Sequence, residues 1–277
     1  METLKEFELC HPCVDLHKIP HLYRFKSIKG AEDSHLEDFF VHGKLYHPLP
    51  TQLNDPFECK PHFVRPSSAS EARELRKYLA KQLRSHQGMP WKQAKEQAKL
   101  MMTDQNRTIE MFRRAAATTY GRARLCSFTT SKENLLFWSH YGDSHQGMCL
   151  EFDSAGGPMR NARQVKYDDY YPNVDVPQPA DESAAKPALV KSRNWKYESE
   201  YRSFIIPDIT EDESKWIRFI ELAPSSLTGI YFGACAQDKD KDRILDLVER
   251  GIFDPRIYDA ELSESTFFLK FKERTCA

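Results

Sequence analysis

Long hydrophobic runs are missing from this sequence of 277 residues. No apolar stretch approaches the ~20 residues that a transmembrane helix needs, and the opening METLKEFELC shows no signal-peptide pattern. A large excess of charge of either sign is also missing, since the net charge is −1. We therefore expect a cytoplasmic protein that has no membrane partner and lacks the overall basic field of a general nucleic-acid binder.

Metal-binding and nucleotide-binding signatures are equally scarce. The seven cysteines are odd in number and widely scattered, which favours free thiols over a disulfide framework. Cys10 and Cys13 form one C-x-x-C pair, but a structural zinc site needs a second close pair, so we expect no metal. The sequence contains neither G-x-G-x-x-G nor a P-loop pattern.

What the sequence does have is a dense mixture of aromatic and polar residues at Leu135–Asp153, LLFWSHYGDSHQGMCLEFD. An apolar start is followed by side chains that can form hydrogen bonds, and Gly147 opens the alternating run MCLEF. This pattern predicts a short helix carrying WSHY, a turn and then a strand. His140 and Tyr141 could serve a site or could simply be satisfied inside a buried aromatic helix.

The order of the elements indicates the fold class. Residues 68–120 are rich in Ala, Arg, Lys, Glu, Gln and Leu and should be almost wholly helical. Because strands come first, then this block, then mostly strands, the pattern indicates α+β rather than a doubly wound α/β fold. We expect a single α+β domain over 1–277, in which 68–120 is a helical insertion or cap on a β-rich body.

Shorter segments surround the helical block. We expect an extended or frayed leader at 1–20, a proline-rich loop at 168–186 and the start of a helix or turn at 189–193. Two further helices are predicted at 32–40 and 239–250. Strands are predicted at 21–27, 44–47, 124–130, 164–167, 200–206, 216–222, 227–232, 258–262 and 266–271.

Four stretches resemble a bacterial family of unknown function. The family is recognised by an FNDPFE signature, a CFS strand, a WSHYA-type segment and a W-x-Y-E-x-E-Y-R segment. The matching stretches here are LYRFKS (22–27), LNDPFEC (53–59), 126–153 and WKYESEYR (195–202). The resemblance runs from residue 22 to about residue 233, and it names no activity.

The layout resembles more distantly the ADP-ribosyltransferases of the Arg–Ser–ExE type. Arg24 lies in the first strand, Thr129-Thr130-Ser131 follows a middle strand, and Glu198-Ser199-Glu200 leads into a later one. The sequence departs from the pattern at Thr129, where the family has Ser. The resemblance implies split, mostly antiparallel sheets and NAD as a substrate.

The chemistry of that family assigns roles to residues here. Breaking the nicotinamide–ribose bond builds positive charge on the ribose, which a carboxylate such as Glu200 would stabilise. Glu198 would position the acceptor or act as its base, and Arg24 would hold the pyrophosphate. The candidate catalytic residues are Glu200, Glu198, His140 and Tyr141. The candidate NAD-binding residues are Arg24, Tyr23, Asn54, Thr129, Ser131 and Trp138.

Each of these residues also has a structural explanation. Glu198, Glu200 and Arg202 alternate and could form a ladder of ion pairs on one strand face, and Arg24 could pair with Glu58 or Asp55. The Asn54-Asp55-Pro56 unit must at least build a turn. Ser131 could cap a helix beginning at Lys132.

The predicted function is NAD-dependent ADP-ribosyl transfer or NAD hydrolysis by a toxin or phage-defence effector. Its partners would be NAD, a macromolecular acceptor, and an antitoxin or regulatory protein. A nucleic-acid acceptor is slightly favoured over a protein, because 68–120 carries a long run of basic residues, although such runs are usually solvated helix faces. The alternatives are a non-catalytic binding or regulatory module of a defence or toxin–antitoxin system, and a metal-independent nuclease or hydrolase that uses His140 with Asp143 or Glu58.

Overall fold

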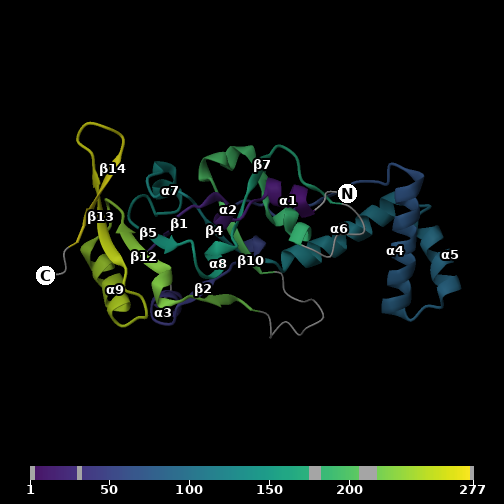
Figure 1. The fold of residues 1–277 in the computed structure, drawn as a ribbon, viewed down its shortest axis with the longest axis horizontal. Helices are drawn as coiled ribbons and strands as arrows, with labels where there is room; N and C mark the ends of the chain where they lie inside the picture. The colour runs from purple at the N-terminus through teal and green to yellow at the C-terminus, as the bar shows by residue number, and fades with distance from the viewer. Residues whose placement is uncertain (1–3, 30–32, 175–181, 206–216, 275–277) are drawn as a thin grey trace. The chain divides into compact units, whose positions relative to one another are not determined.

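The computed structural model describes residues 4–29, 33–174, 182–205 and 217–274 (Figure 1). Its contacts divide the chain into two compact units, where the sequence led us to expect one domain with an insertion. The helical unit comprises Met1–Leu9, Leu49–Ala123 and Lys166–Arg193, and the sheet unit comprises Cys10–Pro48, Arg124–Val165 and Asn194–Ala277. Each unit is therefore assembled from three separate stretches of the chain.

The main sheet of the sheet unit has five strands in the order β1-β5-β12-β13-β14. Neighbouring strands are antiparallel, except that β12 and β13 are parallel. These two are connected through α9 (Asp238–Glu249), as a crossover between parallel strands requires. The strands are β1 (His21–Lys26), β5 (Met148–Asp153), β12 (Leu227–Phe232), β13 (Arg256–Leu262) and β14 (Leu269–Glu273).

A smaller antiparallel sheet, in the order β4-β10-β6, joins the edge of the main sheet. At the junction, Tyr23 of β1 exchanges two backbone hydrogen bonds of 2.8 Å with Thr129. A separate ribbon pairs β2 with β11. These strands are β4 (Arg124–Phe128), β10 (Tyr201–Ile205), β6 (Arg163–Gln164), β2 (Lys44–Tyr46) and β11 (Phe219–Glu221). The short helices of the unit are α2 (Val14–His17), α3 (Asp33–Phe40), α7 (Leu135–His140), α8 (Gly157–Arg160), η3 (Arg193–Glu198) and η5 (Pro224–Ser226).

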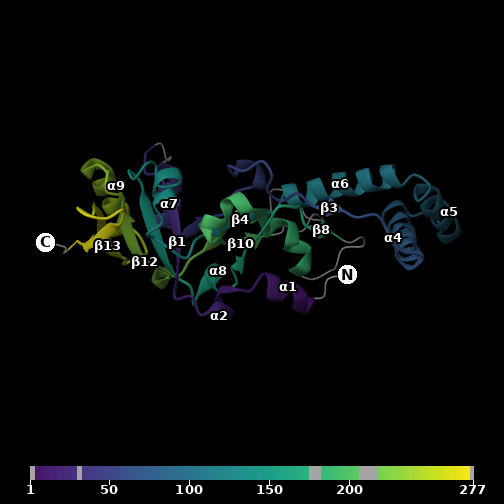
Figure 2. The ribbon, with the colours of Figure 1, turned by 90° about the horizontal axis from the view of Figure 1, so that it is seen from above.

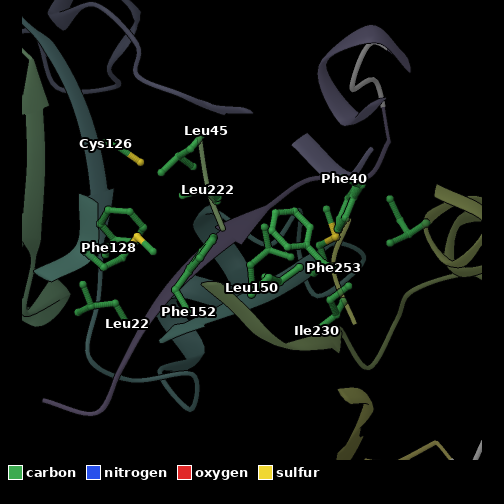
Figure 3. Close-up of a cluster of buried hydrophobic side chains, with 14 of the residues drawn as sticks. Leu22, Phe40, Leu45, Cys126, Phe128, Leu150, Phe152, Leu222, Ile230 and Phe253 are labelled. Atoms are coloured by element: carbon green, nitrogen blue, oxygen red, sulfur yellow. The ribbon is translucent and has the colours of Figure 1, made fainter. Parts of the chain in front are cut away.

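Strand β1 has a hydrophobic cluster on each of its two faces, because successive side chains of a strand point in opposite directions. Leu22 packs into the larger cluster with Leu150 and Phe152 (Figure 3). Tyr23 and Phe25 pack into the other cluster, with Trp138, Cys149 and Tyr231. The same alternation places Arg24 on the face of Leu22 and opposite to Tyr23.

The helical unit is built around three helices. α4 and α5 lie side by side (Figure 2) and bury a small core of leucine and alanine that includes Leu75, Leu79, Ala94 and Ala98. Two short parallel strand pairs, β3 with β8 and β7 with β9, complete the unit. Its elements are α1 (Leu4–Cys10), η1 (Pro50–Gln52), β3 (His62–Phe63), α4 (Ala69–Gln87), α5 (Trp91–Met101), α6 (Gln105–Gly121), β7 (Lys166–Asp168), β8 (Asn173–Val174), η2 (Glu182–Ala188) and β9 (Val190–Ser192).

Most of the predicted elements are confirmed, including helices across 68–120 and the helix–turn–strand order of Leu135–Asp153, and the fold is α+β. The residues 206 and 216 of two predicted strands lie outside the described residues.

Two predictions of local structure are wrong. Residues 1–20 hold the helices α1 and α2 instead of an extended or frayed leader, because Phe7 and Val14 are fully buried and anchor them. Residues 190–192 form strand β9 instead of a helix or turn, because they pair with β7. The proline-rich loop at 168–186 is also interrupted, by β8 and by the start of η2, while 175–181 lie outside the description.

Candidate functional site

A cavity of about 360 Å³ opens in the sheet unit between β1, α3, β2 and β5. Its polar lining is dominated by positive charge. The cationic side chains are Arg24, Lys26, Lys29 and Lys44; the other polar groups are Ser27, His35 and Tyr46; and the apolar wall consists of Leu36, Phe39, Phe40, Leu45, Met148 and Leu150.

Local structure explains why these residues meet. Arg24 and Lys26 are two positions apart on β1 and therefore share one face of the strand. The amphipathic helix α3 turns Leu36, Phe39 and Phe40 toward the sheet, which gives the cavity its apolar wall. The ring of His35 stacks on Tyr46 of β2, with 6.3 Å between the ring centres.

The positive charges of the cavity repel one another. The charge of Arg24, with a smaller contribution from burial, lowers the pKa of Lys26 from 10.5 to about 8. Lys44 has a carboxylate partner, Asp38, at 3.1 Å. None of the described residues that line the cavity is itself acidic. The cavity is therefore a strongly electropositive site, which favours an anionic ligand.

Arg24 and Glu200 act on the same thiol, that of Cys126. Arg24 donates a hydrogen bond from Nη1 to Sγ of Cys126, which is fully buried. Burial raises the pKa of Cys126, and the negative charge of Glu200 adds to the rise, while Arg24 and Lys26 oppose it. The first and last residues of the predicted Arg–Ser–ExE pattern thus lie within electrostatic range of one buried group.

Three predicted catalytic residues gather in a second place. The hydroxyl of Tyr141 donates a 2.6 Å hydrogen bond to Oε1 of Glu198, and Oγ1 of Thr129 donates a 2.8 Å bond to the carbonyl of Glu198. His140 joins this group through Nδ1, which lies 3.3 Å from the hydroxyl of Tyr197. Between the two glutamates, Ser199 has a left-handed φ of 45°, a strained conformation that often accompanies functional sites.

Glu200 itself is not open to solvent. It is 3 % exposed, and its two carboxylate oxygens accept hydrogen bonds of 2.6 and 3.0 Å from Nε and Nη2 of Arg202. This contact is the ion pair between alternating residues that we considered from the sequence. Glu58, which we considered as a partner of Arg24, instead forms a buried ion pair of 3.2 Å with Lys191 in the helical unit.

The remaining predicted binding residues have structural roles. Trp138 is fully buried and donates from Nε1 to the carbonyl of Lys132 at 2.8 Å, so it belongs to the core. Oγ of Ser131 accepts a 3.1 Å bond from the backbone of Glu133, but the N-cap of α7 is Asn134 and not Ser131.

Of the predicted site residues, Arg24 alone lines the cavity. Tyr23 and Asn54 also lie apart from it. Tyr23 lies on the face of β1 opposite to Arg24, within the cluster of Phe25 and Trp138. Asn54 belongs to the helical unit. The neighbouring Asp55 accepts a 2.9 Å bond from the backbone of Phe57, which confirms the predicted turn.

Sequence reasoning missed a buried acidic centre at Glu151. Its carboxylate accepts hydrogen bonds from Tyr231 at 2.7 Å and Thr228 at 3.0 Å, and Lys132 lies 3.8 Å away. Burial opposes its ionisation, but the two hydrogen bonds, together with the charges of His21 and Lys132, outweigh burial and lower the pKa of Glu151. Burial and the same carboxylate raise the pKa of Tyr23. The available signal in the sequence was an acid inside the alternating run MCLEF.

The lysines of the basic cavity were missed as well. Arg24 and Lys26 have the two-residue spacing of one strand face, and this spacing was the available signal. Lys29 and Lys44 come from a loop and from another strand, so only the fold brings them together.

Groups of three or more His, Cys, Asp or Glu that could hold a metal ion do not occur among the described residues. None of the helices in those ranges combines the length and hydrophobicity that spanning a bilayer requires. No protein-family model, curated protein or solved structure matches the chain.

Proposed function

We propose that the sheet unit binds NAD, with its pyrophosphate in the basic cavity, and that the protein is an ADP-ribosyltransferase or an NAD glycohydrolase. The observation that carries the proposal is the convergence of four cationic side chains, Arg24, Lys26, Lys29 and Lys44, on one cavity. The repulsion between Arg24 and Lys26 also lowers the pKa of Lys26. An anion held between them would relieve this repulsion. The cavity of about 360 Å³ is also within the range of small-molecule sites.

The reaction needs few groups from the protein. The bond between ribose C1′ and the nicotinamide nitrogen breaks, nicotinamide leaves with the electron pair, and water or an acceptor adds to C1′ and loses a proton. The planar guanidinium of Arg24 suits the pyrophosphate. Glu200 is our candidate for stabilising the positive charge on the ribose. Its carboxylate is near enough to raise the pKa of Cys126, and Cys126 accepts a hydrogen bond from Arg24, our candidate for holding the pyrophosphate. Glu198 is our candidate for positioning the acceptor.

A specific observation favours a second candidate, a non-catalytic nucleotide-binding module. Glu200 and Glu198 are each 3 % exposed, and each carboxylate already accepts a hydrogen bond from a neighbouring side chain. Carboxylates held in this way stabilise the fold whether or not a reaction takes place. The role as a toxin or phage-defence effector stays a prediction in either case.

The test is to incubate the protein with NAD and to measure released nicotinamide, together with NAD binding by calorimetry. Arg24→Ala should weaken NAD binding about tenfold or more, because a hydrogen bond to a charged group contributes about 1.5–3 kcal/mol. Lys270→Ala changes an exposed lysine of β14 and is the matched control. Binding and release should both remain in this variant.

The possible outcomes separate the two candidates. Binding without release supports the binding module, and absence of both in the unaltered protein contradicts the proposal. Because Arg24 also contacts Cys126, the stability of Arg24→Ala must be measured in parallel. Arg24→Lys keeps the positive charge but loses the planar guanidinium. The NAD affinity of this variant should therefore lie between that of the unaltered protein and that of Arg24→Ala.

A further inference from the structure

Charge is divided very unevenly along the chain. Residues 68–121, which hold α4, α5 and α6, carry eleven Lys or Arg against five Asp or Glu, a net charge of +6. The rest of the chain carries 29 basic and 36 acidic residues, a net charge of −7. The near-zero total therefore conceals a basic block of three helices, which we call the helical block.

In α4, four basic residues lie opposite to the buried Leu75 and Leu79, and in α5 the lysines lie on the exposed side of the helix. On α4, Arg73, Lys77, Lys81 and Arg84 recur every three or four residues and so share one face. On α5, Lys92, Lys95 and Lys99 have the same spacing, while Ala94 and Ala98 face the core of the block. All eleven basic side chains of the block are exposed.

Few of these charges are neutralised within the block. Across its described residues, the ion pairs join Glu110 to Arg113 at 3.8 Å and to Arg114 at 3.3 Å. Glu71 is engaged at the start of α4, where it accepts a 2.7 Å bond from the backbone of Ser67. An ordinary solvated helix face interleaves its charges and pairs them along the helix. Glu74 and Glu96 are interleaved here, but the ion pairs of the described block do not include them.

The block also presents an aromatic ring among its charges. Trp91, at the start of α5, is 37 % exposed, and Nζ of Lys95 lies 5.1 Å from the centre of its ring. Exposed aromatic rings between cations are a feature of surfaces that bind nucleic-acid strands, because bases stack on them.

We propose that the helical block binds nucleic acid through the phosphate backbone, without reading its sequence. Unpaired cations on the outer faces of two helices suit a polyanion. A membrane surface suits the block less, because an interfacial helix must insert its apolar face, and the apolar faces of α4 and α5 are buried against each other. The proposal concerns a different surface from the basic cavity and does not depend on NAD chemistry.

The experiment measures the binding of a labelled DNA duplex and a labelled single-stranded RNA to the whole protein by fluorescence anisotropy. If about four phosphates are contacted, affinity for the duplex should fall about 10²-fold as salt rises from about 50 to about 200 mM. The triple variant R73E/K77E/K81E should weaken binding of the preferred nucleic acid at least tenfold.

The matched control is K239E/K270E/K272E, which places the same change of net charge on exposed lysines of the sheet unit. It should bind to within about twofold of the unaltered protein. Circular dichroism of both variants checks that the helices remain. Equal weakening by both triple variants, absence of binding at low salt, or equally tight binding of polyglutamate would each overturn the proposal; the last outcome would indicate an acidic protein as the partner. NAD turnover plays no part in the readout, so failure here leaves the proposed function untouched.

Discussion

Arg202 holds Glu200 with two hydrogen bonds, from Nε at 2.6 Å and from Nη2 at 3.0 Å, in a part of the sheet unit where both side chains are buried. Removing one partner of a buried ion pair leaves the other charge uncompensated, which typically destabilises a protein by about 3–5 kcal/mol. Any catalytic role of Glu200 therefore has to be separated from this structural one.

The first prediction is that Glu200→Gln lowers the free energy of unfolding by about 3 kcal/mol or more. The amide keeps the shape of the carboxylate but loses the negative charge that accepts the two hydrogen bonds of Arg202. Urea denaturation measures the loss, and Glu221→Gln, at an exposed position of β11, should leave stability unchanged. An unchanged midpoint for Glu200→Gln would mean that the pair contributes no net stability.

The second prediction concerns Lys26 and pH. Its pKa in the folded protein, about 8, is lower than the ordinary 10.5. Between these values the unfolded chain binds more protons, so this residue makes stability rise with pH in that window. In the folded protein Lys26 loses its charge around pH 8, so NAD affinity should fall as pH rises from about 7 to about 9.

Calorimetry at several pH values measures this dependence. In Lys26→Met the affinity should be weaker at neutral pH and nearly flat across the window, whereas Lys270→Met should keep the wild-type profile. A pH profile of Lys26→Met that parallels the wild type would show that another group is responsible.

The third prediction tests the Tyr141–Glu198 contact. Tyr141→Phe removes the 2.6 Å hydrogen bond and leaves a buried carboxylate oxygen without this donor. We expect a loss of about 1–3 kcal/mol in the free energy of unfolding. Tyr170→Phe is the matched control, because Tyr170 is 82 % exposed. Equal effects of the two changes would argue that the hydrogen bond is of no consequence.

The fourth prediction is that Glu151 contributes to acid unfolding. Its pKa in the folded protein is below the ordinary 4.5, so its stabilising effect is present above 4.5 and disappears as pH falls through the folded value. The difference in stability between the wild type and Glu151→Gln should therefore shrink between about pH 6 and about pH 3. A constant difference across this range would contradict the assignment.

The sequence allowed good prediction where structure depends on local patterns. The helix–turn–strand order of Leu135–Asp153 follows from hydrophobic spacing and from Gly147, at which an added Cβ would lie 2.2 Å from the carbonyl of Lys26. The helices of 69–121 follow from composition and caps, such as Ser68 at the start of α4. These signals lie within one or two turns of chain, so no tertiary information is needed.

Contacts between distant residues explain what could not be predicted. Strand β9 exists because Val190 pairs with Lys166, and nothing within 189–193 signals that partner. The alternation of MCLEF does not show that Thr228 and Tyr231 of β12 donate hydrogen bonds to Glu151. Two predicted binding residues, Tyr23 and Arg24, lie on opposite faces of β1. The sequence shows that their side chains alternate, but it does not show which face adjoins the cavity.

Strand β1 separates two chemically different environments by a single residue step. Arg24 faces the basic cavity, and the adjacent Tyr23 faces the centre of Glu151. An insertion or deletion of one residue in β1 would exchange these two side chains and would disrupt both environments at once. Single substitutions in β1, by contrast, change one environment at a time. The paired backbone hydrogen bonds between Tyr23 and Thr129 fix the register of β1 in the folded chain.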